Sequence, residues 1–371
     1  MIFEMSIVET FESWYFFEKW IKFLKKFDFT NSLFIGSAGF EDRSLSSLKS
    51  LINNESFNTN LFKFYFFFLE SHSAIDQESV MGLEIKKEAD KIDEETLKMV
   101  EKLEILKKGK NLNLQIHPFK RTNINEQFIG HEEIYNIIQN DFLGGFPSKV
   151  FLDVSAFPRT VFIPLIKILY QNKQVENLFI VWTNKGGLEY EENVSNYDQV
   201  VDIPLFSGVN IEKEEMKFWL PILNYNTSMI DLVLSQKQFK TNSSLYPIVT
   251  FPSHWPHETN NLLLENKKFF INKTFEIDKV LYLPYNNPFE FFIGIIEFYK
   301  SKKKILSNDF TLTISPFGSK AQSIGASLAG ILLENVRLTI CRPVQYHYDL
   351  KSPPKEEESK SFIAWIKEPP K

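Results

Sequence analysis

The feature that most constrains the fold is a repeated order along the chain: a short apolar segment, then a turn, then a helical segment. In the first half, the apolar segments lie at residues 32–35, 61–69, 112–116, 149–154 and 178–182. The second of them, LFKFYFFFL, is almost entirely apolar, which is typical of a strand buried on both faces. Strands that alternate with helices predict a parallel, doubly wound α/β sheet with helices on both sides.

The same order returns in the second half, at residues 246–251, 279–283, 310–314 and 336–341. We therefore predict two Rossmann-like lobes with mainly parallel sheets, at residues 1–187 and 244–351. The stretch between them, 188–243, is polar and has no strong period, so we expect a transition or linker there. Residues 352–371 carry paired prolines and a Lys/Glu run, which predicts a charged tail that is loosely held except around residues 362–366.

Two helical patterns stand apart from the alternation. Residues 8–26 carry aromatic and apolar residues at three- and four-residue steps, which predicts an amphipathic helix leading the first lobe. We expect it to pack on the body of the protein, although such a face also suits a partner. Residues 76–108 interleave Glu and Lys, which is typical of a solvated helix held by i,i+4 pairs, or of a dimerisation arm.

Composition excludes several classes of function. The formal net charge of −5 implies no broad basic face, so duplex nucleic acid is a poor partner. The single cysteine excludes an internal disulfide and a multi-cysteine metal cage, and it fits a reducing cytosol. No run of about 18 uncharged apolar residues suggests a membrane span. The first residues lack the basic region and apolar core of a secretory signal, so we predict a cytoplasmic protein.

The first candidate ligand-binding turn, Gly36–Ser44, follows the first expected strand. Its candidate residues are Ser37, Gly39, Glu41, Asp42 and Arg43. Glycines let the backbone approach a ligand, the carboxylates suit ribose hydroxyls or a divalent cation such as Mg²⁺, and the guanidinium suits phosphate. The alternative is a capped turn, with Asp42 or Ser44 as the helix N-cap. The pattern is not G-x-G-x-x-G, so NAD binding is not indicated.

The second turn follows the expected strand 149–154. Asp153 ends this apolar segment, where a carboxylate is costly unless it is paired or exposed. Here Asp153 suits a metal or a sugar hydroxyl, while Ser155 and Arg159 suit a phosphate. The alternative is an internal ion pair of Asp153 with Arg159 or Arg43. Because carboxyl ends of parallel strands share one edge of a sheet, this turn should lie beside the first.

The third turn lies within DFTLTISPFGSKAQSIGASLAGI, residues 309–331, where a strand leads through a glycine turn into a helix of small residues. Its candidate ligand-binding residues are Gly318, Ser319 and Lys320. A lysine at a helix N-terminus opposes the helix dipole, and a bound anion would explain it. The alternative is that Lys320 is a solvated first-turn residue. The full P-loop pattern is absent, which disfavours a Walker-type NTPase.

Other reactive residues give weaker patterns. His254, His257 and Glu258 lie within five residues, but without a further cluster we favour structural histidines and predict no metal site. The same holds for the segment YHYD at 346–349. Cys341 lies in an expected buried strand and is predicted to be unreactive.

Gly318-Ser319-Lys320 resembles the G-[GT]-[TS]-K signature of CARF domains, and the strand ending in Gly36-Ser37 is similar to their first ligand loop. CARF domains are Rossmann-like sensors of cyclic oligoadenylates in CRISPR-associated ancillary proteins. The chain departs from the family in lacking a double glycine before Ser319 and in placing the motif near the C-terminus. The resemblance implies a Rossmann-like nucleotide pocket and a sensing role in antiviral defence.

Three hypotheses follow. In the first, the three turns form one pocket of a cytosolic nucleotide- or phosphate-binding protein, in which Arg43, Arg159 and Lys320 hold phosphates. In the second, a hydrolase or transferase acts on a nucleotide or phosphosugar in that pocket, with Glu41 or Asp153 as general base or metal ligand. In the third, the chain is a non-catalytic subunit or homodimer that meets its partner through its two outlying helices.

Overall fold

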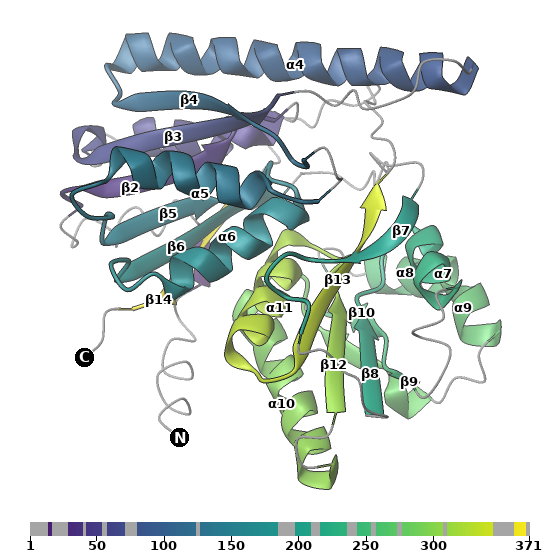
Figure 1. Cartoon of the computed structure of the whole chain (residues 1–371). Coiled ribbons are helices and arrows are strands. Elements are labelled where there is room, and N and C mark those ends of the chain that lie inside the picture. Colours follow the sequence, from purple (N-terminus) through teal and green to yellow (C-terminus); the bar gives the residue numbers. More distant parts are fainter. Residues whose placement is uncertain are drawn as a thin grey trace. The chain divides into compact units, whose positions relative to one another are not determined.

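The computed structural model of the chain divides into two compact units. Unit 1 is Met1–Glu189 with Tyr348–Lys371, and unit 2 is Tyr190–His347. The structure describes residues 14–16, 29–39, 42–53, 58–70, 80–123, 127–184, 197–208, 216–235, 243–253, 257–272, 277–306, 310–343 and 360–368. Each unit is an α/β sandwich around its own sheet, which confirms the predicted fold class (Figure 1).

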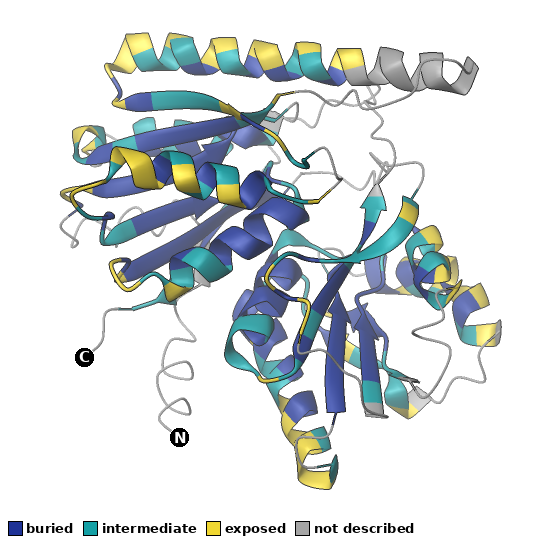
Figure 2. Ribbon diagram, viewed as in Figure 1, coloured by how far each residue is buried: buried dark blue, intermediate teal, exposed yellow. Residues whose placement is uncertain are grey.

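The sheet of unit 1 has seven strands in the order β1-β14-β6-β5-β2-β3-β4. Its strands are β1 (Trp14–Phe16), β2 (Ser32–Ser37), β3 (Phe62–Leu69), β4 (Leu114–Phe119), β5 (Lys149–Asp153), β6 (Asn177–Asn184) and β14 (Lys360–Lys367). The five from β2 to β6 run parallel to one another, and β14 runs antiparallel to β6. The central strands are buried on both faces, as their apolar sequences predict (Figure 2).

Helical segments cover both faces of this sheet. They are η1 (Asp42–Leu45), α3 (Ser46–Ile52), η2 (Thr59–Leu61), α4 (Val80–Lys110), α5 (Gly130–Asp141) and α6 (Arg159–Gln171). Helices α3 and α4 share one apolar cluster with β2 and β3, which includes Leu48, Leu103 and Phe66. Helices α5 and α6 lie in front of the sheet in Figure 1.

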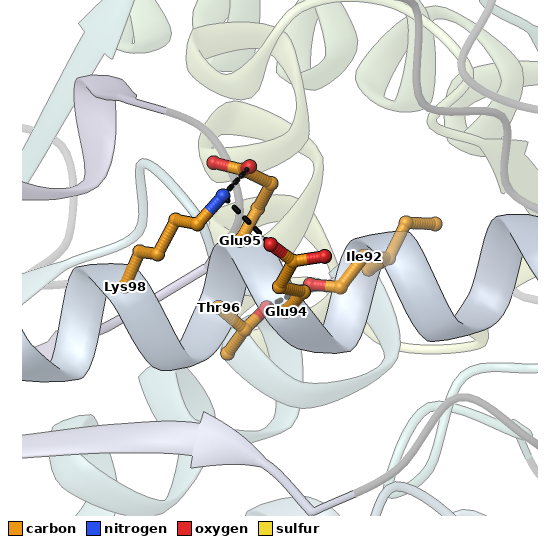
Figure 3. Close-up of polar contacts among 5 residues, drawn as sticks. All are labelled: Ile92, Glu94, Glu95, Thr96 and Lys98. Atoms are coloured by element: carbon orange, nitrogen blue, oxygen red, sulfur yellow. Dashed lines mark hydrogen bonds and ion pairs between the residues drawn. The ribbon is translucent and has the colours of Figure 1, made fainter.

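Helix α4 is the charged helix expected from the Glu and Lys pattern. Lys98 Nζ lies 3.0 Å from a Glu94 oxygen and 2.7 Å from a Glu95 oxygen (Figure 3). On the opposite side of the helix, Ile92 and Leu103 are buried. The apolar residues therefore attach the helix to the sheet, and the i,i+4 and i,i+3 pairs lie on its solvated face.

The main sheet of unit 2 has the order β7-β13-β12-β8-β9, and a parallel bridge from Ile222 to Ile248 continues it into the pair β10-β11. Its strands are β7 (Tyr197–Asp202), β8 (Met216–Pro221), β9 (Ser243–Leu245), β10 (Ile248–Thr250), β11 (Leu281–Leu283), β12 (Phe310–Ser315) and β13 (Val336–Pro343). Its helices are α7 (Thr227–Ser235), α8 (Glu258–Glu265), α9 (Lys267–Asn272), η4 (Ile277–Lys279), α10 (Pro288–Leu306) and α11 (Lys320–Leu332).

The small residues of α11 serve the packing of this helix. A Cβ added to Gly325 would lie 2.6 Å from the carbonyl oxygen of Pro288 and 2.8 Å from the ring of Phe291, both in α10. A Cβ added to Gly330 would lie 2.5 Å from the ring of Phe206. The glycines thus let α11 approach its neighbours closely, which accounts for its composition without a ligand.

The two units share one strand order. In unit 1 the parallel strands lie in the order β6-β5-β2-β3-β4, and in unit 2 they lie in the order β13-β12-β8-β9/β10-β11. When the parallel strands are numbered along the chain and the sheets are read from β4 and from β11, each has the Rossmann order 3-2-1-4-5. Each unit also adds an antiparallel strand beside its fifth parallel strand. The order reverses between the first and fourth strands, which are β2 and β5 in unit 1 and β8 and β12 in unit 2.

The structure differs from three predicted boundaries. The expected linker 188–243 contains β7, β8 and α7, and these elements belong to unit 2. The expected tail 352–371 contains β14, which includes the segment 362–366 that was expected to be held and which pairs with β6 in the sheet of unit 1. Within the expected helix 8–26, Trp14–Phe16 form a strand because they pair with β14, and most of that segment lies outside the described residues. Long-range strand pairing overrides local pattern at each position.

Candidate functional site

The first two predicted turns lie side by side in unit 1, as expected. Strand β2 pairs in parallel with β5, with Ile35 opposite Leu152, so both strands end at the same edge. A Cβ added to Gly39 would lie 3.1 Å from the Cβ of Ala156, so the turns are in contact. This edge is the point at which the strand order reverses, where open α/β sheets bind ligands. We call it the unit 1 edge.

Glycine has a steric role at the start of the first turn. A Cβ added to Gly36 would lie 2.6 Å from the ring of Phe66 on the neighbouring strand. The next residue, Ser37, is buried, and the backbone N–H of Ala38 donates to the carbonyl oxygen of Phe67 at 2.8 Å. The beginning of the turn is therefore fixed against β3, and Gly39 is the first residue of the turn that is partly exposed.

Asp153 is almost completely buried, with 1% of its surface exposed. One carboxylate oxygen accepts a hydrogen bond from the hydroxyl of Ser47, and the other accepts from the hydroxyl and the backbone N–H of Ser155, the latter at 2.9 Å. The Ser155 hydroxyl oxygen accepts in turn from the backbone N–H of Thr183 at 2.9 Å. A buried carboxylate requires such donors. Asp153 and Ser155 therefore join β5, α3 and β6 beneath the two turns.

The two predicted arginines lie on the helical segments that leave this edge. Arg43 lies in η1 and Arg159 is the first residue of α6, and both are half-buried. The N-cap of α6 is Pro158, which provides no side-chain cap. The N-cap of α3 is Leu45, so neither Asp42 nor Ser44 caps that helix. Glu41 lies outside the described residues, and only the backbone of Asp42 is described.

The third predicted turn belongs to unit 2, so the single pocket built from three turns stays a prediction. Ser319 is the N-cap of α11: its hydroxyl oxygen accepts from the N–H of Gln322 at 3.1 Å, and its own N–H donates to Gln322 Oε1 at 2.9 Å. A Cβ added to Gly318 would lie 2.6 Å from Ile222. Gly318 and Ser319 thus have structural roles, and the half-buried Lys320 is the part of the motif best suited to a ligand.

The sequence did not single out two tyrosines at the carboxyl edge of unit 2. Tyr225 follows β8, and its hydroxyl donates to the backbone carbonyl oxygen of Glu258 at 3.1 Å. Burial, with the nearby Glu258 and Glu265 carboxylates and the Tyr285 phenol, raises the pKa of Tyr225 to about 12. Tyr285 follows β11. The position of Tyr285 just past the predicted strand 279–283 was a signal for that residue, and the position of Tyr225 would have been one had β8 been recognised.

The other residues singled out in the sequence form no metal-binding group within the described part of the chain. No group of three or more His, Cys, Asp or Glu side chains there is arranged to hold a metal ion. His254 and residues 346–349 lie outside that part, and His257 is exposed at the N-cap of α8. Burial raises the pKa of the Cys341 thiol to about 12, which disfavours the reactive thiolate. The helices that are described include none suited by length and apolarity to crossing a membrane.

Comparison with known proteins identifies no family. Neither a protein-family model nor a curated protein matches the chain. Among solved structures, it is similar to the functionally unknown protein PA1789 from Pseudomonas aeruginosa PAO1, with 10% sequence identity and a TM-score of 0.23. That match covers 85% of this chain and 93% of PA1789.

Proposed function

We propose that the protein binds a phosphate-bearing small molecule of the nucleotide class at the unit 1 edge. The observation that carries this proposal is the contact of the two predicted turns, Gly39 against Ala156, where the strand order of a Rossmann-type sheet reverses. Ligands of open α/β sheets bind at such a position because two loops diverge there.

The chemistry of this edge suits an anion. Arg43 and Arg159 provide forked guanidinium donors that match phosphate oxygens in pairs. Arg159 begins the 13-residue helix α6, whose N-terminal dipole favours negative charge. The partly exposed Gly39 has no side chain to keep a ligand from the backbone.

Binding is favoured over catalysis. A general base must reach the substrate, but Asp153 is buried and its carboxylate oxygens accept from Ser47 and Ser155. The enzyme alternative therefore depends on Glu41. We propose a sensor, and the resemblance of the strand ending in Gly36-Ser37 to the first ligand loop of CARF domains supports a cyclic oligoadenylate as ligand and a role in bacterial defence. The single, buried cysteine supports a cytosolic location.

A thermal-shift screen tests the proposal. The full chain is melted with mono-, di- and cyclic nucleotides and with phosphosugars, with and without Mg²⁺. A ligand at about 100 times its dissociation constant should add about 2.7 kcal/mol of stability. Arg43→Ala and Arg159→Ala should each reduce the ligand-induced shift, measured against the unliganded variant.

Lys173→Ala is the matched control, because this exposed cation lies just beyond the opposite end of α6. It should keep the full shift. If no compound shifts the melting temperature, or if the arginine variants respond as the wild type does, the proposal is wrong. The complex-subunit hypothesis would then be preferred, and a search for a protein partner would follow.

A further inference from the structure

The side of α4 that faces solvent carries a regular stripe of residues. The side that faces the sheet is buried at three- and four-residue steps, at Ile92, Thr96, Met99 and Leu103. With about 3.6 residues per turn, the opposite side of the helix carries a second set at the same steps. This set, which we call the outer stripe, consists of exposed residues (Figure 2): Asp90, Glu94, Leu97, Glu101, Ile105 and Lys108. Residues at these steps can all face one neighbouring helix.

Two large apolar side chains of the outer stripe are exposed to water. Leu97 has 54% of its surface exposed, and Ile105 has 70%. They lie at equal distances on either side of Glu101 and are about 12 Å apart along the helix at a rise of 1.5 Å per residue. A helix packed on the outer stripe would remove both side chains from water, which is favourable.

The charges of α4 are divided along its length. Residues 90–95 include four carboxylates and one lysine, whereas residues 106–110 include three lysines and no carboxylate. The helix dipole acts mainly on the first and last turns of a helix, and α4 begins at Val80. The dipole accounts for the lysines of the last turn, but it does not account for an acidic segment that lies more than two turns inside the helix.

Ion pairs within α4 leave these charges incompletely matched. One ammonium group serves two carboxylates, because Lys98 Nζ lies 3.0 Å from a Glu94 oxygen and 2.7 Å from a Glu95 oxygen. Among the residues that the structure describes, the exposed Lys108 has no ion-pair partner. Glu94 and Lys108 lie at equal distances on either side of Glu101. The surplus carboxylate and this lysine therefore match each other when a second α4 lies in the reverse direction.

We propose that the outer stripe of α4 pairs in antiparallel direction with the outer stripe of a second copy of this chain, about a two-fold axis at Glu101. This arrangement places Glu94 opposite Lys108 of the second copy, and Leu97 opposite Ile105 of the second copy. Two-fold symmetry repeats each contact. A parallel pair would instead place carboxylate against carboxylate and lysine against lysine, which is unfavourable.

This dimer forms reversibly and depends on concentration. The contact from Glu94 to Lys108 is about 21 Å long, and Glu101 faces its own counterpart at the axis, which weakens the pair. Exposed charge pairs are screened by salt, so the dimer should dissociate as the salt concentration rises. The pairing involves neither turn of the unit 1 edge, so it does not depend on the ligand site proposed above.

Sedimentation of the full chain over a concentration series tests the proposal by charge reversal. Glu94→Lys and Lys108→Glu should each weaken the dimer by about tenfold or more, because two attractions become two repulsions. The double variant Glu94→Lys/Lys108→Glu should recover the wild-type dimer, and so should an equimolar mixture of the two single variants, since both restore the opposite charges. Lys304→Glu is the matched control, because this exposed lysine lies in α10 of unit 2, and it should dimerise as wild type does.

Single cysteines test the register of the pair. Glu101→Cys should form a disulfide-linked dimer on mild oxidation, because the two copies of this position meet at the axis. Leu97→Cys alone should not, because its two copies would lie about 12 Å apart along the helices, but it should link to Ile105→Cys in an equimolar mixture. The native Cys341 is buried and does not compete.

Three results would overturn the proposal. The wild type could remain monomeric at every concentration, or the single charge reversals could dimerise as strongly as the wild type does. Efficient linkage of Leu97→Cys to itself would show a parallel pair, which the antiparallel arrangement excludes.

Discussion

Removal of the Asp153 carboxylate should destabilise unit 1 strongly, whether or not a ligand binds. In Asp153→Ala, three buried donors lose their acceptor: the hydroxyl of Ser47, and the hydroxyl and N–H of Ser155. Each buried unsatisfied donor costs about 1–3 kcal/mol, and partial relaxation should leave a total of about 3–5 kcal/mol. In Asp153→Asn, the remaining oxygen can still accept from Ser155 and the amide can donate to Ser47, so we expect about 1–2 kcal/mol.

Urea unfolding followed by circular dichroism measures this effect as a shift of the unfolding midpoint. Asp90→Ala is the control, because Asp90 is an exposed carboxylate of α4 in the same unit, and its loss should change stability by less than about 0.5 kcal/mol. The reasoning would be refuted if Asp153→Ala unfolded within about 1 kcal/mol of the wild type. That result, together with a loss of ligand binding in Asp153→Asn, would favour a direct role of this carboxylate at the ligand.

Three further predictions concern particular side chains. Burial lowers the pKa of His131, so as pH falls below about 6.5 the unfolded chain binds a proton before the folded chain does. The free energy of unfolding should therefore keep its full value above that pH and decrease by up to about 1.4 kcal/mol per pH unit below it. His131→Leu should remove this part of the pH dependence of the urea midpoint. Gly325→Ala should destabilise the protein by about 1–3 kcal/mol because the added Cβ meets α10. The control Gly109→Ala in α4, whose Cβ meets nothing within 4 Å, should be neutral or stabilising. Equal melting temperatures of the two variants would contradict the packing argument. Because burial raises the pKa of Cys341 to about 12, its thiol should react with a thiol reagent only after unfolding in urea. Rapid labelling of the native protein would contradict this and show that β13 is accessible at Cys341.

The parallel strands were the most predictable part of the fold. Residues 61–69 and 149–154 are compact apolar runs followed by turns, so local pattern identifies them as buried strands. Strands β1 and β14 were not predictable in this way. They pair with each other in antiparallel register from the two ends of the chain, with Trp14 opposite Ala364. The alternation that identifies a parallel sheet provides no information on antiparallel strands added at its side.

The candidate site was predictable in position but not in the role of each residue. The sequence located the turns at Gly36–Ser44 and Asp153–Arg159, because both follow apolar strands. It did not reveal that Ser47, 106 residues before Asp153, donates to that carboxylate, since this contact exists only in the folded unit. The capping box of α11 was readable, because Gln322 lies three residues after Ser319 and this spacing is its signature. Ser319 was instead predicted to bind a ligand.

Hydrogen–deuterium exchange with and without the best nucleotide from the screen tests the central claim most directly. Binding at the unit 1 edge should protect the backbone of residues 36–39 and 155–162, because a ligand there covers the turns that meet at Gly39 and Ala156. Arg159→Ala should lose this protection, and Lys173→Ala should retain it. Protection confined to other segments, or none at a saturating nucleotide concentration, would contradict the account.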